Sequence, residues 1–160
     1  MILSDCRIGS EGASSLAVAL KLNKTLEFLH MSGSTCDVRT MSDFGDALQV
    51  NSTLRGLNLS SCNINDDGIN YLIEAIKKNI ANTNIRYIDL DDNPITLDKI
   101  EALKKLIRVS VVTYGTIRDR ANRNSLRTES APIKQNVEYL RNALAFKEEM
   151  RYIDNYNCHI

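Results

Sequence analysis

Tryptophan, long apolar runs and an excess of charge of either sign are all absent from this chain of 160 residues. No apolar run approaches the roughly 20 residues that a membrane-spanning helix needs, so we expect no membrane protein. The 20 Lys and Arg balance the 20 Asp and Glu, and no net field therefore attracts nucleic acid or an anionic membrane surface. No basic segment followed by an apolar stretch opens the chain, and we expect no secretory signal.

Cysteine and histidine are too few and too scattered to suggest a metal centre or an active site. None of the four Cys forms a C-x-x-C pair, which argues against zinc and favours a reducing cytosol or nucleus. We predict a cytoplasmic location. The acidic run from Asp89 to Asn93 resembles a calcium loop, but Pro94 and Ile100 stand where such a loop needs Gly and Glu. His30 is expected to be a surface residue rather than a triad member. We predict no enzyme, no cofactor and no metal.

What the chain does contain is an internal repeat of 28 residues. An L-x-x-L-x-L pattern recurs at Leu26, Leu29 and Met31, again at Leu54, Leu57 and Leu59, and after a three-residue insertion at Ile85, Ile88 and Leu90. Asn23, Asn51 and Asn79 close successive units. Such a period indicates a repeat architecture, in which each unit buries its apolar face only by stacking on its neighbours.

Each unit combines a strand pattern with a helix pattern. The L-x-x-L-x-L segment alternates as a strand does, and pairs such as Leu72 and Ile76 follow at helical spacing. Gly12 and Gly68 are expected in the turn before the helix, where a positive φ or tight packing is needed. Parallel strands stack about 4.8 Å apart and helices about 8–10 Å apart, so we predict an α/β solenoid with a curved parallel sheet on its concave side and helices on its convex side.

The segment L-x-x-L-x-L-S-S-C-N-I-N-x-x-G at residues 54–68 resembles the ribonuclease-inhibitor-like class of leucine-rich repeats. The resemblance covers about residues 1–108 and implies a fold rather than a function, because this class includes inhibitors, GTPase activators, innate-immune sensors and cytoskeletal or ciliary subunits. We predict about four repeats over residues 1–114. The first is incomplete, since Leu3 is only the last inward residue of its strand. An upstream part absent from this chain, or another chain that covers the exposed edge, would explain this.

Some positions depart from the repeat or bear on its interior. In the second unit Thr40 replaces the turn Gly, and Ser34 replaces the residue that closes the strand, so we expect an irregular loop there. Cys6 and Cys62 occupy equivalent positions two repeats apart, too far for a disulfide. They are expected to be buried, as is Cys36.

The last third of the chain loses the repeat. Val109, Val112 and Tyr114 are expected to form a final strand. Residues 115–130 are polar and predict a surface linker; a basic nucleic-acid arm is the alternative, but no aromatic residues accompany its Arg. A helix is predicted at residues 131–154. It carries one apolar stripe, formed by Ile133, Val137, Leu140 and Leu144. This stripe either caps the last repeat or binds a partner.

The function predicted from the sequence is protein–protein interaction. Open solenoids bind through extended surfaces, most often the concave one. In-register stacking places seven candidate partner-binding residues there: Phe28, His30, Arg55, Asn58, Arg86, Tyr87 and Asp89. The first alternative is a structural subunit of a cytoskeletal, ciliary or axonemal assembly, held by the open repeat edge and the C-terminal helix. The second is a regulator of a GTPase. We expect a protein partner, no nucleic acid and no membrane.

Overall fold

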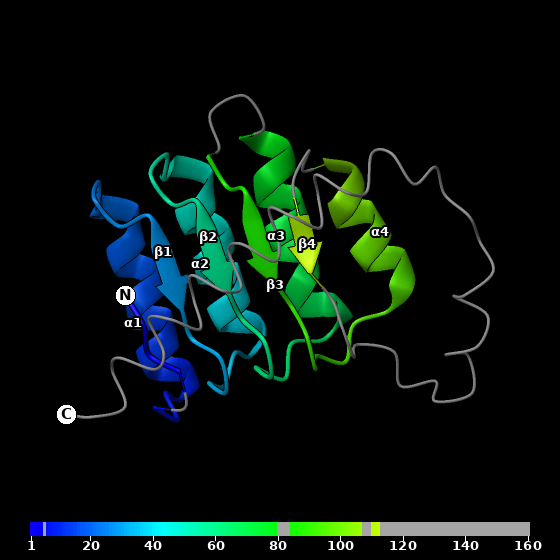
Figure 1. Cartoon of the computed structure of the whole chain (residues 1–160), viewed down its shortest axis with the longest axis horizontal. Helices are drawn as coiled ribbons and strands as arrows, with labels where there is room; N and C mark the ends of the chain where they lie inside the picture. Colours follow the sequence, from blue (N-terminus) through cyan, green and yellow to red (C-terminus); the bar gives the residue numbers. More distant parts are fainter. Residues whose placement is uncertain (5, 80–83, 107–109, 113–160) are drawn as a thin grey trace. The chain divides into compact units, whose positions relative to one another are not determined.

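A computed structural model describes residues 1–4, 6–79, 84–106 and 110–112, with the side chains of the last three left out. Helices and strands alternate along the chain (Figure 1). Their order is α1 (Ser10–Leu22), β1 (Phe28–His30), α2 (Val38–Val50), β2 (Gly56–Asn58), α3 (Asp66–Lys78), β3 (Tyr87–Asp89), α4 (Leu97–Leu106) and β4 (Ser110–Val112). No helix in the described ranges is long and apolar enough to cross a membrane.

The strands form one parallel sheet in the order β1-β2-β3-β4, so each strand lies beside the next in sequence. The register follows the predicted repeat: Leu29 pairs with Leu57, and Leu57 pairs with Ile88. The incomplete first unit adds a single bridge in the same register, between Ile2 and His30. The expected final strand exists as β4, while Val109 and Tyr114, which were assigned to it, lie outside the described residues.

The core lies between the sheet and the helices, which form a second layer on one side of the strands (Figure 1). Its largest fully buried side chains come from both layers and from the turns between them: Phe44, Leu29, Met31, Met41, Leu48, Leu54, Leu57, Leu59, Ile64, Ile69, Leu72 and Ile76. These are the alternating strand positions and the helical positions of the repeat. Burial of this ladder is the main apolar contribution to stability, because no single unit encloses its own core.

Asparagine amides join successive units at the ends of α2 and α3. The Asn51 amide accepts hydrogen bonds from the backbone N–H groups of Thr53 and Leu54, and its Nδ2 donates to the carbonyl oxygen of Leu20 at 2.8 Å. Asn79 Nδ2 donates in the same way to the carbonyl oxygen of Leu48 at 2.8 Å. These buried side chains satisfy backbone groups that the irregular turns leave without partners.

Asn93 plays the corresponding role at the end of β3. Its Oδ1 accepts from the backbone N–H groups of Cys62 and Ile64, at 3.1 and 2.8 Å, and its Nδ2 donates to the carbonyl oxygen of Leu59 at 2.8 Å. The amide therefore ties the third unit to the fourth. The acidic run that resembles a calcium loop is here the turn after a strand, and Asp92 in it has a φ of 54°.

The glycine positions correct one detail of the sequence prediction. Gly12 and Gly68 lie within the first turns of α1 and α3, not in the turns before them. Neither has a positive φ. Their requirement is space, because a Cβ on Gly68 would lie 3.1 Å from Met41 Cγ and one on Gly12 would lie 2.9 Å from Ile8 Cγ2. Close packing, within the first unit for Gly12 and between the second and third units for Gly68, explains both residues better than backbone conformation does.

The second unit differs from its neighbours mainly in its loop. Arg7 of the first unit and Asn63 of the third occupy equivalent positions and have φ values of 50° and 57°. The equivalent residue of the second unit, Thr35, is not in the left-handed region. The helix that follows nevertheless begins regularly. The Asp37 side chain caps α2 by accepting a hydrogen bond from the Thr40 backbone N–H at 2.8 Å. The Thr40 hydroxyl lies 3.1 Å from the carbonyl oxygen of Ser10 in the preceding unit.

Candidate functional site

The face of the sheet turned away from the helices, here called the strand face, carries side chains that do not repeat. Because Leu29 and Leu57 point into the core, the residues on either side of them point outward. The sheet register aligns Phe28 with Gly56 and Tyr87, and His30 with Asn58 and Asp89. The sequence prediction of these two columns is therefore confirmed as an alignment, whereas their role in binding stays a prediction.

Asp89 stands at the centre of a hydrogen-bonded network on the strand face. Tyr87 Oη donates to Asp89 Oδ2 at 2.9 Å, and Asn58 Nδ2 lies 3.4 Å from the same oxygen. The backbone N–H of Asp91 donates to Asp89 Oδ1 at 3.0 Å. Both carboxylate oxygens thus have donors, and the aromatic, amide and acidic side chains hold one another in fixed positions. The sequence predicted the three residues separately but not this network.

A row of hydroxyl groups continues the network toward the C-terminal ends of the strands. The Ser60 hydroxyl lies 2.8 Å from Asn58 Oδ1 and 3.0 Å from the Ser32 hydroxyl of the neighbouring unit. The Ser60 backbone N–H also donates to Asn58 Oδ1 at 2.9 Å. Asn58 therefore connects the serine row to the carboxylate of Asp89.

Charged side chains border the strand face where the strands begin. Glu27, Arg55 and Arg86 stack in successive units, because the Arg55 N–H donates to the Glu27 carbonyl and the Arg86 N–H to the Arg55 carbonyl, both at 2.7 Å. Arg55 Nη1 also lies 3.2 Å from Glu27 Oε2 in an exposed ion pair. We call these three residues the charged rim. Their long side chains are exposed and can reach a partner.

The strand-face columns are less accessible than the sequence suggested. His30, expected to be a surface residue, is only 6% exposed, and Tyr87 and Asp89 are 7% and 6% exposed. His30 stands between Ile2 and Asn58, one strand spacing away on either side. Asp89 is enclosed by its own donors. The prediction of a solvated His30 was therefore wrong, and the accessible candidates are Arg55, Arg86 and the half-buried Asn58.

The cysteines follow the predicted pattern only in part. Cys36 and Cys62 are buried, but Cys6 is exposed, which corrects the expectation that Cys6 is a core residue. In the third unit, the Cys62 thiol lies 3.3 Å from the carbonyl oxygen of Met31, in the preceding unit. Among the described residues, no unit precedes that of Cys6 to provide such a cover. Cys158 lies outside the described residues.

Cys36 and Cys62 form a pair between the second and third units. The Cys36 backbone N–H donates to the carbonyl oxygen of Cys62 at 3.0 Å. A hydrogen bond with the Cys62 thiol, together with burial, raises the pKa of Cys36. The same hydrogen bond lowers the pKa of Cys62. The proximity of Cys36 and Cys62 follows from the loop geometry and has no counterpart in the repeat alignment.

Side chains that could bind a metal ion do not gather in the described part of the structure. There, no three His, Cys, Asp or Glu side chains approach one another closely enough to hold a metal ion. The predicted helix residues Ile133, Val137, Leu140 and Leu144, and the linker at 115–130, lie outside the described residues. The strand face with its charged rim is therefore the candidate site.

Comparison with known proteins agrees with this architecture. Three segments of the chain, residues 2–17, 50–72 and 81–103, match the leucine-rich repeat family model. These matches support a leucine-rich-repeat family. They do not distinguish the ribonuclease-inhibitor-like class from other leucine-rich repeats.

Two known proteins are similar to the chain. Protein TORNADO 1 of Arabidopsis thaliana is 25% identical over 130 residues, which are 75% of this chain but 9% of that protein. The chain therefore spans only a small part of the length of this relative. Among solved structures, Leiomodin-1 Actin-Binding Site 2 superposes with a TM-score of 0.61 at 16% identity, covering 99% of this chain and 88% of that one. At this identity, the likeness shows the fold alone.

Proposed function

We propose that this chain is a non-enzymatic interaction module that binds a protein partner through its strand face, the side expected to be concave. The observation that carries the proposal is the contrast between repeated and unrepeated positions. The inward strand positions hold Leu, Ile or Met in every unit, because they build the core. The outward positions instead combine an aromatic ring, an amide and a carboxylate, held together around Asp89. Fixed polar groups beside exposed Arg are typical of surfaces that recognise proteins.

The charged rim would make the first contact and the Asp89 network would set the specificity. Arg is enriched among the residues that dominate binding energies, and Arg55 and Arg86 are both exposed. The ion pair between Arg55 and Glu27 is solvated and contributes little to folding, so Arg55 can exchange Glu27 for a carboxylate of the partner. Tyr87 and Asp89 are buried already and would act by holding Asn58 and the rim in position.

The experiment is a quantitative capture of binding proteins from cell lysate by the whole chain, read by mass spectrometry. The double variant Arg55→Ala and Arg86→Ala should reduce the recovery and the affinity of the captured protein by about fivefold or more, which corresponds to about 1 kcal/mol. The matched control is Arg39→Ala, because Arg39 is an exposed Arg on α2, away from the strand face. Equal capture by the double variant and the control would reject the strand face as the binding surface.

A second candidate function is that of a structural subunit in a larger assembly, such as a cytoskeletal or ciliary one. It is favoured by an exposed apolar edge on α1, where Val18 and Leu22 are 49% and 85% exposed. Filamentous actin is the first filament to test, because the fold neighbour is an actin-binding site by its title. Cosedimentation of the chain with actin filaments, unaffected by the two Arg substitutions, would favour this candidate over the first.

A further inference from the structure

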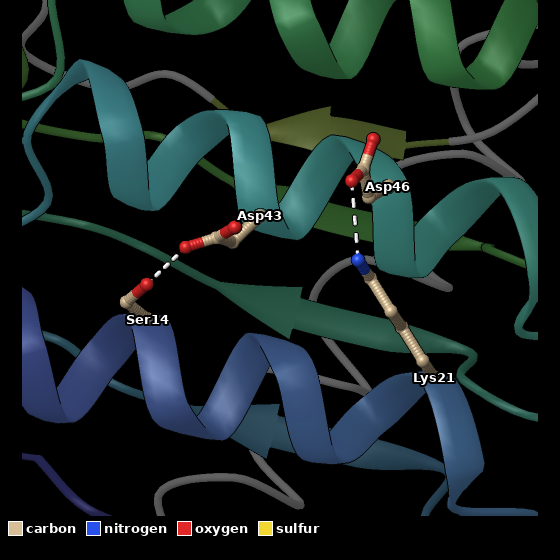
Figure 2. A network of polar contacts seen from close by, with 4 residues as sticks. All are labelled: Ser14, Lys21, Asp43 and Asp46. Atoms are coloured by element: carbon tan, nitrogen blue, oxygen red, sulfur yellow. Dashed lines mark hydrogen bonds and ion pairs between the residues drawn. The ribbon is translucent and has the colours of Figure 1, made fainter.

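The contacts that join successive units differ from one boundary to the next. Between the first and second units, polar side chains join the helices. Asp43 accepts a hydrogen bond from Ser14, and Asp46 Oδ2 lies 3.1 Å from Lys21 Nζ. Figure 2 shows these two contacts side by side between α1 and α2. At the next boundary, between the second and third units, two cysteines take part in the contact.

The second and third units approach one another closely in both layers. In the helix layer, a Cβ added to Gly45 on α2 would lie 3.0 Å from the carbonyl oxygen of Tyr71 on α3. Beyond the ends of β1 and β2, the Cys36 backbone N–H donates to the Cys62 carbonyl oxygen at 3.0 Å. The loop before α2 and the loop before α3 are therefore in direct contact.

Backbone groups of the second unit hold the Cys62 sulfur in place. The sulfur lies 3.3 Å from the Met31 carbonyl oxygen and accepts a hydrogen bond from the Ser34 backbone N–H. Asn93 contacts the third unit in the same way, because its Nδ2 donates to the Leu59 carbonyl and its Oδ1 accepts from the Cys62 N–H. The Cys62 sulfur thus occupies the place of an amide, where an N–H donor favours the thiolate over the thiol.

The second thiol lies against the first. The Cys36 and Cys62 thiols are hydrogen-bonded to each other, and both side chains are buried in the same core cluster. The equivalent positions at the other two boundaries hold an apolar and a polar residue: Ile8 with Ser34, and Ile64 with Asn93. The repeat itself therefore does not require two thiols at this place.

We propose that Cys36 and Cys62 are an oxidation site, at which a small hydroperoxide such as hydrogen peroxide converts the two thiols into a disulfide between the second and third units. A disulfide spans Cα atoms about 4.4–6.8 Å apart, and neighbouring strands lie about 4.8 Å apart. The backbone hydrogen bond between the two residues keeps them near this separation. Both sulfur atoms are buried, so a small neutral oxidant reaches them more easily than a bulky one does.

The reaction has two steps. The hydrogen bond from the Cys36 thiol, together with that from the Ser34 N–H, lowers the pKa of Cys62, so the Cys62 thiolate is the nucleophile. It attacks one peroxide oxygen, an S–O bond forms, the O–O bond breaks, and the leaving hydroxide takes a proton to become water. The Cys36 sulfur then attacks the Cys62 sulfur, the S–S bond forms, and the S–O bond breaks to release a second water. The two thiols lose two electrons and two protons in total, and the peroxide takes up both.

The disulfide would tie together the two loops that follow the serine row of the strand face. Ser60 belongs to this row, and its carbonyl oxygen accepts from the Gly33 N–H at 3.0 Å and lies 3.3 Å from the Cys62 sulfur. A covalent link between Cys36 and Cys62 restricts the unfolded chain and should therefore oppose separation of the two units. The thiols belong to the core and not to the strand face, so this site does not depend on the partner proposed above.

The test uses the whole chain with Cys6→Ser and Cys158→Ser, so that Cys36 and Cys62 are its only thiols. After treatment with hydrogen peroxide, remaining thiols are alkylated under denaturing conditions, and the unreduced digest is read by mass spectrometry. We expect a peptide that joins Cys36 to Cys62 within one chain and that disappears on reduction with dithiothreitol. The oxidised chain should also melt at a temperature about 5 °C or more above that of the reduced chain.

The matched control keeps two thiols but separates them. The chain with Cys36→Ala and Cys158→Ser retains Cys6 and Cys62, which lie two repeats apart, and should form no disulfide within the chain. Circular dichroism checks that both chains are folded before oxidation. The proposal would be overturned by Cys36 and Cys62 that stay unlinked under peroxide, by equal linking in the control, or by a disulfide that lowers the melting temperature.

Discussion

The boundary between the first and second units is one place where the repeat positions can be compared. The other is the edge of the first unit that no other described unit covers, and the same positions are in a different state there. At the boundary, Ala47 is buried and Asn51 Nδ2 donates to the Leu20 carbonyl of the first unit. The His30 backbone forms hydrogen bonds with Met1 and Leu3, the residues on either side of Ile2. At the edge, Ala19 is exposed, and among the described residues only the Oδ1 atom of the Asn23 amide has hydrogen-bond partners. The residue type is nearly the same in both places. Its contribution to stability depends on whether a neighbouring unit is present.

The largest expected effect is on the ladder of core residues, which only the interior of the stack contains. Leu57 is completely buried and pairs with Leu29 on one side and Ile88 on the other. Leu57→Ala should therefore lower the free energy of unfolding by about 2–5 kcal/mol, measured by denaturant titration, because the cavity lies between three units that cannot close it. A loss below about 1 kcal/mol would mean that the units do not pack as described.

The asparagines provide the sharpest contrast between boundary and edge. Asn51→Ala removes the amide that satisfies two backbone N–H groups and bridges to the first unit, and should cost about 2–3 kcal/mol, since each buried group left unsatisfied costs about 1–3 kcal/mol. Asn23→Ala removes the equivalent side chain at the exposed edge, where water replaces the lost bonds, and should cost less than about 1 kcal/mol. Urea titrations of dilute samples compare the two. Equal losses would contradict the contrast between boundary and edge.

An effect smaller than that of Asn51→Ala is expected at the cap of α2, which lies beside the first boundary. The hydrogen bond from the Thr40 backbone N–H lowers the pKa of Asp37. This contribution to stability is therefore complete above the ordinary range of an aspartate pKa, and is lost as the pH falls through the lowered pKa of the folded state. Asp37→Ala should cost about 1 kcal/mol near neutral pH.

The matched variant for the cap is Asp37→Asn, because Asn caps a helix nearly as well and does not titrate. Near neutral pH, its thermal stability should lie close to that of the parent chain. Below the folded pKa of Asp37, the parent chain should lose the stability that the charged cap supplied, while Asp37→Asn should show no such loss at this site. Parallel pH profiles for the two chains would show that the Asp37 carboxylate does not contribute through its charge.

The repeat pattern predicted much of the fold because its positions are local and periodic. The inward Leu, the helical apolar pairs and the strand register were all predictable, since a period of two in a strand and of 3.6 in a helix fixes which side chains share a face. The pairing of Phe28 with Gly56 and Tyr87 followed directly. The accessibility of His30 and the close contact of Gly68 with Met41 could not be predicted, because both depend on how closely the units approach one another.

By itself, the sequence determined a stack of strand-and-helix units and the residues that face its interior. Only the tertiary structure decided what the remaining side chains do. It joined Tyr87, Asn58 and Asp89 in one network, paired Cys36 with Cys62, and left Cys6 exposed although it occupies the position of Cys62 in the repeat. The physical reason is that a repeat fixes the position of a residue within its unit, whereas its burial and its hydrogen bonds depend on the units that lie on either side.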